Sequence, residues 1–189
     1  MYVRDAKNRE EVWLLDRLEE FDFEDPAFRS RDYVIAIDEE EGQKVGFGRI
    51  RAHTTDGEFC ELRCIGVLPE WRGSGVGAHL LERLVELARD QGFETVFVFT
   101  AQPEYFDQFG FDRVDSTALS EAQQNRLDAV SRRRGDDAVV AMRTSVGAFS
   151  IPSRLRRRYE RDEEESPTEH PEDFGIDPSS ASYKYDTGR

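Results

Sequence analysis

The distribution of apolar residues along the chain predicts alternating helices and strands. Apolar residues recur at helical spacing between Val12 and Phe21, which predicts an early amphipathic helix. The segments 76–91 and 119–133 also read as helices. Strands are predicted where apolar residues alternate or run together, at 33–37, 45–52, 59–67, 95–99, 112–115 and 138–144. These elements show no internal repeat, and their number suits one domain with its own core.

The helix over 76–91 joins two strands that we expect to be parallel. Its apolar residues fall on one side, and Gly92 suits the cap at its C-terminal end. Residues 96–99 form an unbroken apolar run, typical of a strand covered on both faces. Because a strand, a helix and a strand follow one another, we predict a right-handed parallel crossover.

A glycine-rich turn lies between the strand 59–67 and this helix. It reads Leu68-Pro69-Glu70-Trp71-Arg72-Gly73-Ser74-Gly75-Val76-Gly77. Glycine permits backbone conformations that a Cβ atom would forbid and lets a ligand approach closely. Amide groups exposed at such a turn, helped by the helix dipole, form a cradle for an anion. The turn therefore predicts a phosphate-binding site, with a tight turn that binds nothing as the alternative.

Two common nucleotide-binding motifs fit this turn poorly. A P-loop needs Lys-Ser or Lys-Thr after its last glycine, whereas Gly77 is followed by Ala78 and His79. A dinucleotide fingerprint needs a strand that runs directly into the first glycine and an acidic residue at the end of the next strand. Here residues 69–72 intervene, and the next strand ends at Thr100. The sequence favours another class of phosphate ligand.

Two motifs together resemble the GCN5-related N-acetyltransferase (GNAT) superfamily. Its acetyl-CoA signature, Gln/Arg-x-x-Gly-x-Gly/Ala, matches residues 72–77, and the aromatic-x-x-x-Gly-Phe end of its fourth helix matches residues 105–111. The resemblance implies an α/β fold with a central, mostly antiparallel twisted sheet. It further implies one parallel crossover at the acetyl-CoA site, helices on both faces, acetyl-CoA as co-substrate and no metal.

The resemblance also implies which residues bind acetyl-CoA. In the superfamily, the amides of the glycine turn hold the pyrophosphate, and the end of the preceding strand pairs with the pantetheine arm like an extra strand. The implied acetyl-CoA-binding residues are Ile65, Gly66, Val67, Arg72, Gly73, Ser74, Gly75, Val76, Gly77, Ala78 and Phe106.

Acetyl transfer to an amine needs an acceptor for the amine proton, and the superfamily often uses a carboxylate on this strand. Glu61 is our candidate, with Glu58 in reserve. Strand alternation places Glu61, Arg63 and Ile65 on one face, and Cys60, Leu62 and Cys64 on the other. A solvated Glu61 that pairs with Arg63 and takes no part in catalysis is an equally weighted alternative.

A proton donor for the departing thiolate is less evident. Many superfamily members carry Tyr at the position of Phe106, and Tyr105 lies one place earlier. Adjacent helical residues point about 100° apart, so Tyr105 acts only if the local geometry differs. Otherwise water is the donor and Tyr105 is a half-buried structural residue, which is the interpretation that the sequence favours. Cys64 as an acyl-carrying nucleophile is disfavoured, because no His is placed to be its base.

Residues 61–72, 96–100 and 105–111 are similar to the acetyl-transfer domain of amino-acid N-acetyltransferases, the N-acetylglutamate synthases. The pattern that helps those enzymes bind glutamate has only a loose counterpart at 131–134. An α-carboxylate would need a bidentate arginine, for which Arg63, Arg132 and Arg134 are candidates. We expect an acetyl-CoA-dependent N-acetyltransferase that acts on a small amine or an amino acid. A protein N-acetyltransferase and a CoA-binding regulatory module remain open, as does a homodimer.

The charge is strongly acidic, with 40 Asp and Glu against 26 Lys and Arg and a net charge of −14. Lysine occurs only at positions 7, 44 and 184. An acidic, lysine-poor surface is typical of a halophile that accumulates salt, where cations screen the repulsion. This hypothesis predicts unfolding in low salt, and a melting temperature indifferent to KCl would contradict it.

Composition changes near Ser150, which predicts a domain over 1–149 and a charged, disordered tail over 150–189. The spacing of Ile151, Leu155 and Tyr159 allows a short docking helix first. The arginines of 154–161 are followed at once by acidic residues, without an aromatic platform, so nucleic-acid binding is not expected.

The remaining features point to a cytoplasmic protein. The sequence has neither an apolar span of membrane length nor a signal peptide at its charged start. Cys60 and Cys64, on one extended strand, would lie roughly 13 Å apart, too far for a disulfide, so both are expected to be reduced. The three histidines match no metal-ligand spacing, so no metal site is expected.

Overall fold

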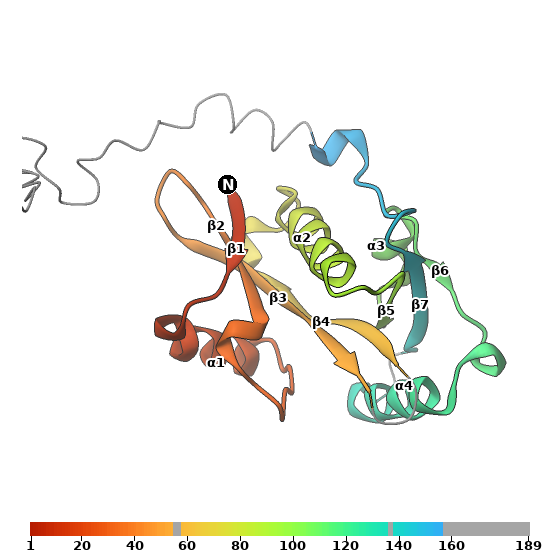
Figure 1. Cartoon of the computed structure of the whole chain (residues 1–189). Helices are drawn as coiled ribbons and strands as arrows, with labels where there is room; N and C mark the ends of the chain where they lie inside the picture. Colours follow the sequence, from red (N-terminus) through yellow and green to blue (C-terminus); the bar gives the residue numbers. More distant parts are fainter. Residues whose placement is uncertain (55–57, 136–137, 157–189) are drawn as a thin grey trace, which may run out of the picture.

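The computed structural model describes residues 1–54, 58–135 and 138–156. These residues form a sheet in the order β1-β2-β3-β4-β5-β7-β6 (Figure 1). The strands are β1 (Tyr2–Asp5), β2 (Tyr33–Ile37), β3 (Lys44–His53), β4 (Phe59–Val67), β5 (Thr95–Thr100), β6 (Asp112–Arg113) and β7 (Val140–Ser145). All neighbouring strands are antiparallel except β4 and β5, which are parallel. The predicted mixed sheet with one parallel crossover is confirmed.

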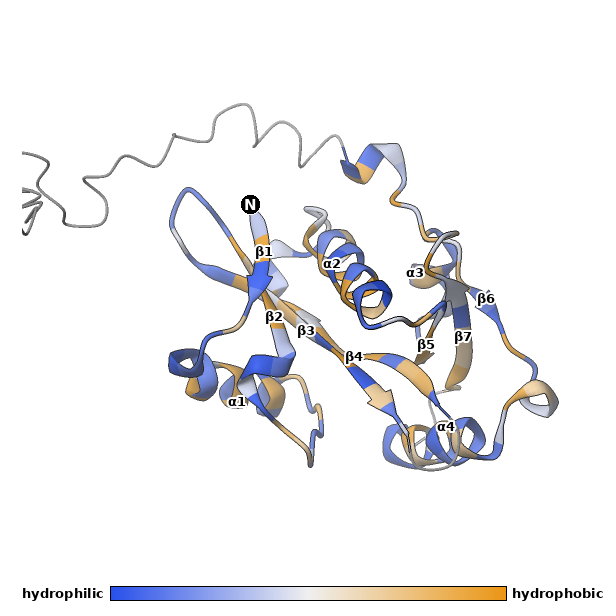
Figure 2. Ribbon diagram, viewed as in Figure 1, coloured by the Kyte–Doolittle hydropathy of each residue, from blue (hydrophilic) through white to orange (hydrophobic). Residues whose placement is uncertain are grey.

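The crossover helix, α2 (Val76–Asp90), covers one face of the sheet and holds the larger apolar core. Leu80, Leu81 and Leu84 are fully buried, in contact with apolar side chains of the central strands. Figure 2 shows the alternation of hydrophobic and hydrophilic residues around this helix. Burial of one apolar stripe, rather than helix propensity, stabilises such a helix.

The opposite face carries α1 (Glu11–Glu20) and α4 (Glu121–Arg134) at different ends of the strands. A smaller apolar core lies under α1, where Leu14 and Leu18 pack with Tyr33, Ile35 and Phe47. Val12 and Leu15, predicted to belong to the same apolar stripe, stay exposed. None of the described residues of α4 is buried, and Figure 2 shows this helix as largely hydrophilic.

A β-bulge interrupts β4 before its end. Arg63 pairs with Arg49 on β3, but the next paired position is Gly66 with Phe47, so β4 has an extra residue. Cys64 takes a left-handed conformation there, with φ of 51°. A bulge of this kind shifts the following side chains to the other face.

The bulge corrects two predictions from strand alternation. Cys60 lies in the core under α2, whereas Cys64 lies in the core under α1, so the two cysteines are not on one face. Ile65 packs against the α2 core and therefore does not share a face with Glu61. Both cysteines are free and buried, as expected.

The segment after β7 packs back onto the α2 face. The amide of Ser150 donates to the Phe109 carbonyl, and Ile151 is buried in the larger core. Residues 153–156 form a short helical turn in which Leu155 contacts the same core. The domain boundary predicted at 149 thus falls before a packed segment. Tyr159 and the rest of the predicted tail lie outside the described residues.

A further short helix lies between β5 and β6. The short helix α3 (Pro103–Asp107) follows β5 and packs beside α2 through Tyr105. No helix of the described residues is long and apolar enough to cross a membrane.

Candidate active site

The glycine turn opens α2 in a conformation that requires glycine. Gly73 and Gly75 have φ of 81° and 98°, the left-handed region that a Cβ atom disfavours. Gly75 is the N-cap residue, so the amides of Val76 and Gly77 belong to the first turn of α2. The first amides of a helix have no acceptor within the helix, and they carry the positive end of its dipole. The geometry is that of an anion cradle.

The side chains of this turn hold its shape. Arg72 donates from Nε to the Val67 carbonyl at 3.3 Å, and its guanidinium lies 5.9 Å from the centre of the Phe21 ring. Ser74 Oγ donates to the Trp71 carbonyl at 2.5 Å. The side chains of Val76 and Ala78 are buried in the core, so these two residues could reach a ligand only through their backbone.

Beside the turn, β4 and β5 separate. The two strands pair at Cys60–Val96 and Glu61–Phe97, and among the described residues no pair follows along β4. The edge of residues 65–67 that would face β5 is thus open for another extended chain, next to the anion cradle. Main-chain groups at such an edge bind an extended ligand in the manner of an added strand.

Tyr105 lies against the start of α2. A Cβ atom added at Gly77 would lie 2.2 Å from the Tyr105 hydroxyl oxygen, so only glycine leaves room for it. The residue as a whole is 36% exposed, and burial of its phenol raises the pKa of Tyr105 to about 12. The phenol is therefore protonated at neutral pH. Phe106 is 9% exposed and packs in the core, and its predicted contact with acetyl-CoA stays a prediction.

Glu61 is a buried carboxylate, with 2% of the residue exposed. Arg126 of α4 binds this carboxylate through two nitrogen atoms. Its Nε donates to both oxygens at 2.9 Å, and its Nη2 donates to Oε1 at 2.7 Å. His53 Nε2 lies 2.7 Å from Oε2. Burial opposes the charged form, but hydrogen bonds from His53 and Arg126 outweigh it and lower the pKa of Glu61. Glu61 is therefore neither solvated nor paired primarily with Arg63.

His53 and Arg126 are both partly exposed, whereas the Glu61 carboxylate between them is buried. The ring of His53 stacks on Phe59 with 4.2 Å between the ring centres and an angle of 3°, which fixes its orientation. The His53 side chain is 22% exposed, against 3% for that of Glu61. The His53 ring therefore lies between the buried carboxylate and the surface.

Of the other candidates, Arg63 lies closest to this chemistry in sequence and structure. It donates from Nη2 to the Glu24 carbonyl, and its buried Nε has no hydrogen-bond partner among the described residues. Arg132 donates to the Asp128 carbonyl of its own helix, and Arg134 is exposed at the helix end. Glu58 is exposed and precedes β4. The structure therefore brings Arg63, and not Glu58, to the strand segment that carries Glu61.

The sequence model of the acetyltransferase (GNAT) family matches residues 2–111, more than half of the chain. The chain belongs to this family. In this GNAT protein, the matched region contains the glycine turn, the open edge of β4, Glu61 and Tyr105.

The relatives of this GNAT protein include amino-acid acetyltransferases. That of Mycobacterium tuberculosis is 33% identical over 79 residues, 42% of this chain and 44% of the relative. That of Pseudomonas paraeruginosa is 46% identical over 57 residues, 30% of this chain and 13% of the relative. The aligned part thus spans less than half the length of either relative.

Solved structures show the same fold. Rv2747 from Mycobacterium tuberculosis, in complex with CoA and NLQ, has a TM-score of 0.64 at 20% identity, over 77% of this chain and 99% of that one. N-acetylglutamate synthase from Neisseria gonorrhoeae, complexed with CoA and N-acetyl-glutamate, has a TM-score of 0.62 at 18% identity, over 76% and 34%.

Sequence reasoning missed His53 and Arg126 in this GNAT protein. Neither residue belongs to an unusual sequence pattern: His53 is the last residue of β3, and Arg126 lies on the polar helix α4. A signal was available for His53 alone: β3 and β4 form a hairpin, and a hairpin places residues of its two strands side by side. Arg126 is 65 residues from Glu61 and gave no such signal.

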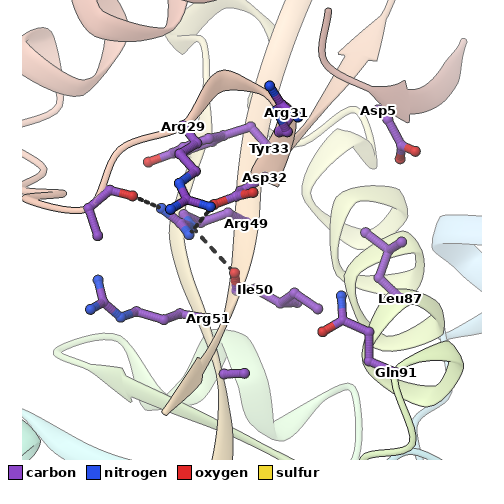
Figure 3. A pocket seen from close by; sticks show the side chains of 12 residues that line it. Asp5, Arg29, Arg31, Asp32, Tyr33, Arg49, Ile50, Arg51, Leu87 and Gln91 are labelled. Carbon is purple, nitrogen blue, oxygen red and sulfur yellow. Dashed lines mark hydrogen bonds and ion pairs between the residues drawn. The ribbon is translucent and has the colours of Figure 1, made fainter. Parts of the chain in front are cut away.

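A second hollow lies away from the glycine turn, at the other end of α2. This cavity has a volume of about 410 Å³. Figure 3 shows Leu87 of α2 and Gln91, the residue that caps this helix, along the border of the cavity. Its arginines are Arg29, Arg31, Arg49 and Arg51. Arg49 is neutralised by ion pairs with Asp25 and Asp32 and lies over the Tyr33 ring, so it holds the segment before β2 against β3.

No group of His, Cys, Asp and Glu among the described residues could hold a metal ion.

Proposed function

We propose that this protein is an acetyl-CoA-dependent N-acetyltransferase that acetylates the amine of a small molecule, specifically an amino acid. The observation that supports it best is the arrangement along β4. An open strand edge at residues 65–67 leads into an anion cradle, and a buried ionised carboxylate, Glu61, lies on the same strand. Family membership and the amino-acid acetyltransferases among the relatives support the same function.

The reaction needs no covalent enzyme intermediate. With both substrates bound, the neutral amine attacks the thioester carbonyl carbon, a C–N bond forms, the C–S bond breaks and CoA leaves as a thiolate. Amides at the open end of β4 are suited to hold the carbonyl oxygen as charge develops on it. Cys64 is buried, which raises the pKa of its thiol, so it is a poor nucleophile.

Glu61 would accept the amine proton, because its lowered pKa keeps it ionised through the neutral range. A low pKa also makes a carboxylate a weak base. An acceptor whose own carboxylate shares Arg126 would weaken the pair with Glu61 and raise the pKa of Glu61. His53, which is partly exposed, would then pass the proton to solvent. Tyr105, protonated at neutral pH, or water would protonate the thiolate.

Two arginines favour an acceptor with a carboxylate. Arg126 reaches Glu61 from α4, and Arg63 keeps a buried Nε donor without a partner among the described residues. A buried unpaired donor costs about 1–3 kcal/mol, which a ligand carboxylate would recover. A neutral amine would leave this donor unpaired, so the site should prefer an amino acid to a simple alkylamine.

Turnover with acetyl-CoA tests the proposal. CoA release in molar KCl would be followed by chromatography against free amino acids, polyamines and a basic peptide. Turnover of an amino acid, with its decarboxylated amine as the matched control, would support the proposal. Preference for the peptide would favour a protein N-acetyltransferase. CoA binding without turnover of any acceptor would favour a regulatory module instead.

A further inference from the structure

The segment that follows β7 lies directly against the predicted acetyl-CoA turn. The Leu155 carbonyl oxygen is 3.7 Å from the position of a Cβ atom added at Gly75. Ile151 is 7% exposed and Leu155 packs on the same core, so two apolar side chains hold the segment in place. Figure 1 shows it in blue, above α2 and α3. The C-terminal segment, defined here as residues 150–156, is part of the surroundings of the glycine turn.

Two arginines of the C-terminal segment bridge the helices beside this turn. Arg156 forms an ion pair with Glu82 of α2 at 3.0 Å. Arg154 donates to the side-chain oxygen of Gln108, just after α3. Glu82 lies seven residues beyond Gly75, roughly 10 Å along the helix. The segment is thus fixed both at the start of α2 and beside α3.

The two arginines have different partners, one charged and one neutral. Arg156 is matched by the carboxylate of Glu82, which His79 and Arg156 keep ionised by lowering its pKa. Arg154 donates to a neutral amide, and it is exposed, so its charge is available to a ligand. In a protein of net charge −14, a polyanionic ligand needs such local positive charge.

We propose that the C-terminal segment forms the outer wall of the acetyl-CoA site, and that Arg154 binds a phosphate of the nucleotide end of the coenzyme. This inference rests on the proposed function. Arg156 is a positioning residue, because its pair with Glu82 holds the segment on α2. The domain boundary predicted from the sequence at residue 149 would place this wall outside the domain.

The test is the dissociation constant for CoA, measured by calorimetry on the full chain carrying Arg154→Gln. We expect CoA to bind about five-fold more weakly, the value of one exposed charge contact. Pantetheine, which carries no phosphate, should bind wild type and variant equally. Dephospho-CoA separates the phosphates: equal binding to both proteins assigns Arg154 to the 3′-phosphate, and a retained five-fold loss assigns it to the pyrophosphate. Arg9→Gln removes an exposed arginine elsewhere and is the matched control.

Arg156→Gln should weaken CoA binding less, and added KCl should reduce CoA affinity more steeply for wild type than for Arg154→Gln. Unchanged CoA affinity in Arg154→Gln would overturn the inference while wild-type turnover left the proposed function intact. Tighter binding would also overturn it, because it would identify the segment as a cover over the turn. Wild type that binds no CoA would instead refute the proposed function itself.

Discussion

The face of the sheet under α2 and the face under α1 and α4 are held together by different forces. Under α2, a continuous apolar core surrounds Leu80, Leu81 and Leu84, and one turn with left-handed glycines supplies the anion cradle. On the other face, α4 buries no residue and is joined by ion pairs, Arg126 with Glu61 and Arg133 with Asp22. The α2 face therefore depends on apolar burial, whereas the α4 end of the other face depends on charge and on pH.

Among these variants, loss of Arg126 should lower the free energy of unfolding the most. Arg126→Ala leaves the Glu61 carboxylate buried without its bidentate partner, and we expect the free energy of unfolding to fall by about 3–5 kcal/mol at neutral pH. The lowered pKa of Glu61 means that its stabilising contribution is present above the ordinary value of 4.5 and is lost as pH falls through the folded value. The effect should therefore shrink on acidification, as urea unfolding at pH 7 and pH 4 would measure.

Leu84→Ala is the matched control on the α2 face, because Leu84 is fully buried among apolar side chains. It should cost about 2–5 kcal/mol through lost contacts and a cavity, with no dependence on pH. If the two variants responded alike to pH, the distinction between the faces would not hold.

Glu61→Gln tests the same charged face through catalysis. The amide cannot accept a proton, so we expect kcat to fall about 100-fold or more, with CoA affinity unchanged. Single-turnover rates and calorimetry would measure the two quantities. Because Glu58 is exposed beside β4, Glu58→Gln is the comparison. A greater loss at Glu58 than at Glu61 would contradict the assignment.

Gly77→Ala tests the contact between the glycine turn and Tyr105. Alanine normally stabilises a helix by about 1 kcal/mol relative to glycine. Here its Cβ would meet the Tyr105 hydroxyl at 2.2 Å, so we expect a net loss of about 1 kcal/mol or more. Adding Tyr105→Phe removes the clashing oxygen and should restore the melting temperature. A double variant as unstable as Gly77→Ala alone would show that another contact is responsible.

The two cysteines provide the smallest and most closely matched comparison. Cys60 and Cys64 are both buried, but only Cys64 has a left-handed backbone. Glycine at position 64 would lose the buried side chain, but it would also remove the strain of the left-handed backbone. That strain costs a non-glycine residue about 1–2 kcal/mol. Cys64→Gly should therefore destabilise the protein by about 1 kcal/mol less than Cys60→Gly, measured by urea unfolding. Equal losses would indicate that the bulge carries no strain.

Local patterns predicted most of the elements, and the exceptions have physical causes. The helix predicted at 76–91 is α2, which buries a periodic apolar stripe, and the strand predicted at 95–99 is β5, which buries most of an unbroken apolar run. β1 was missed, because Tyr2–Asp5 is a short edge strand with polar residues and no apolar pattern. The face of Ile65 was predicted wrongly, because a bulge adds a residue without changing the composition of the strand.

The sequence by itself determined the glycine turn, because left-handed glycines and the first amides of a helix are properties of neighbouring residues. It also determined the α2 core, since a helical stripe and an apolar strand can bury each other in few ways. Only the tertiary structure decided that Arg126 and His53 meet at Glu61, and that the backbone of Leu155 lies beside Gly75 in the glycine turn. Ion pairs between distant polar residues leave no period in the sequence, because any exposed helix could carry the same arginine.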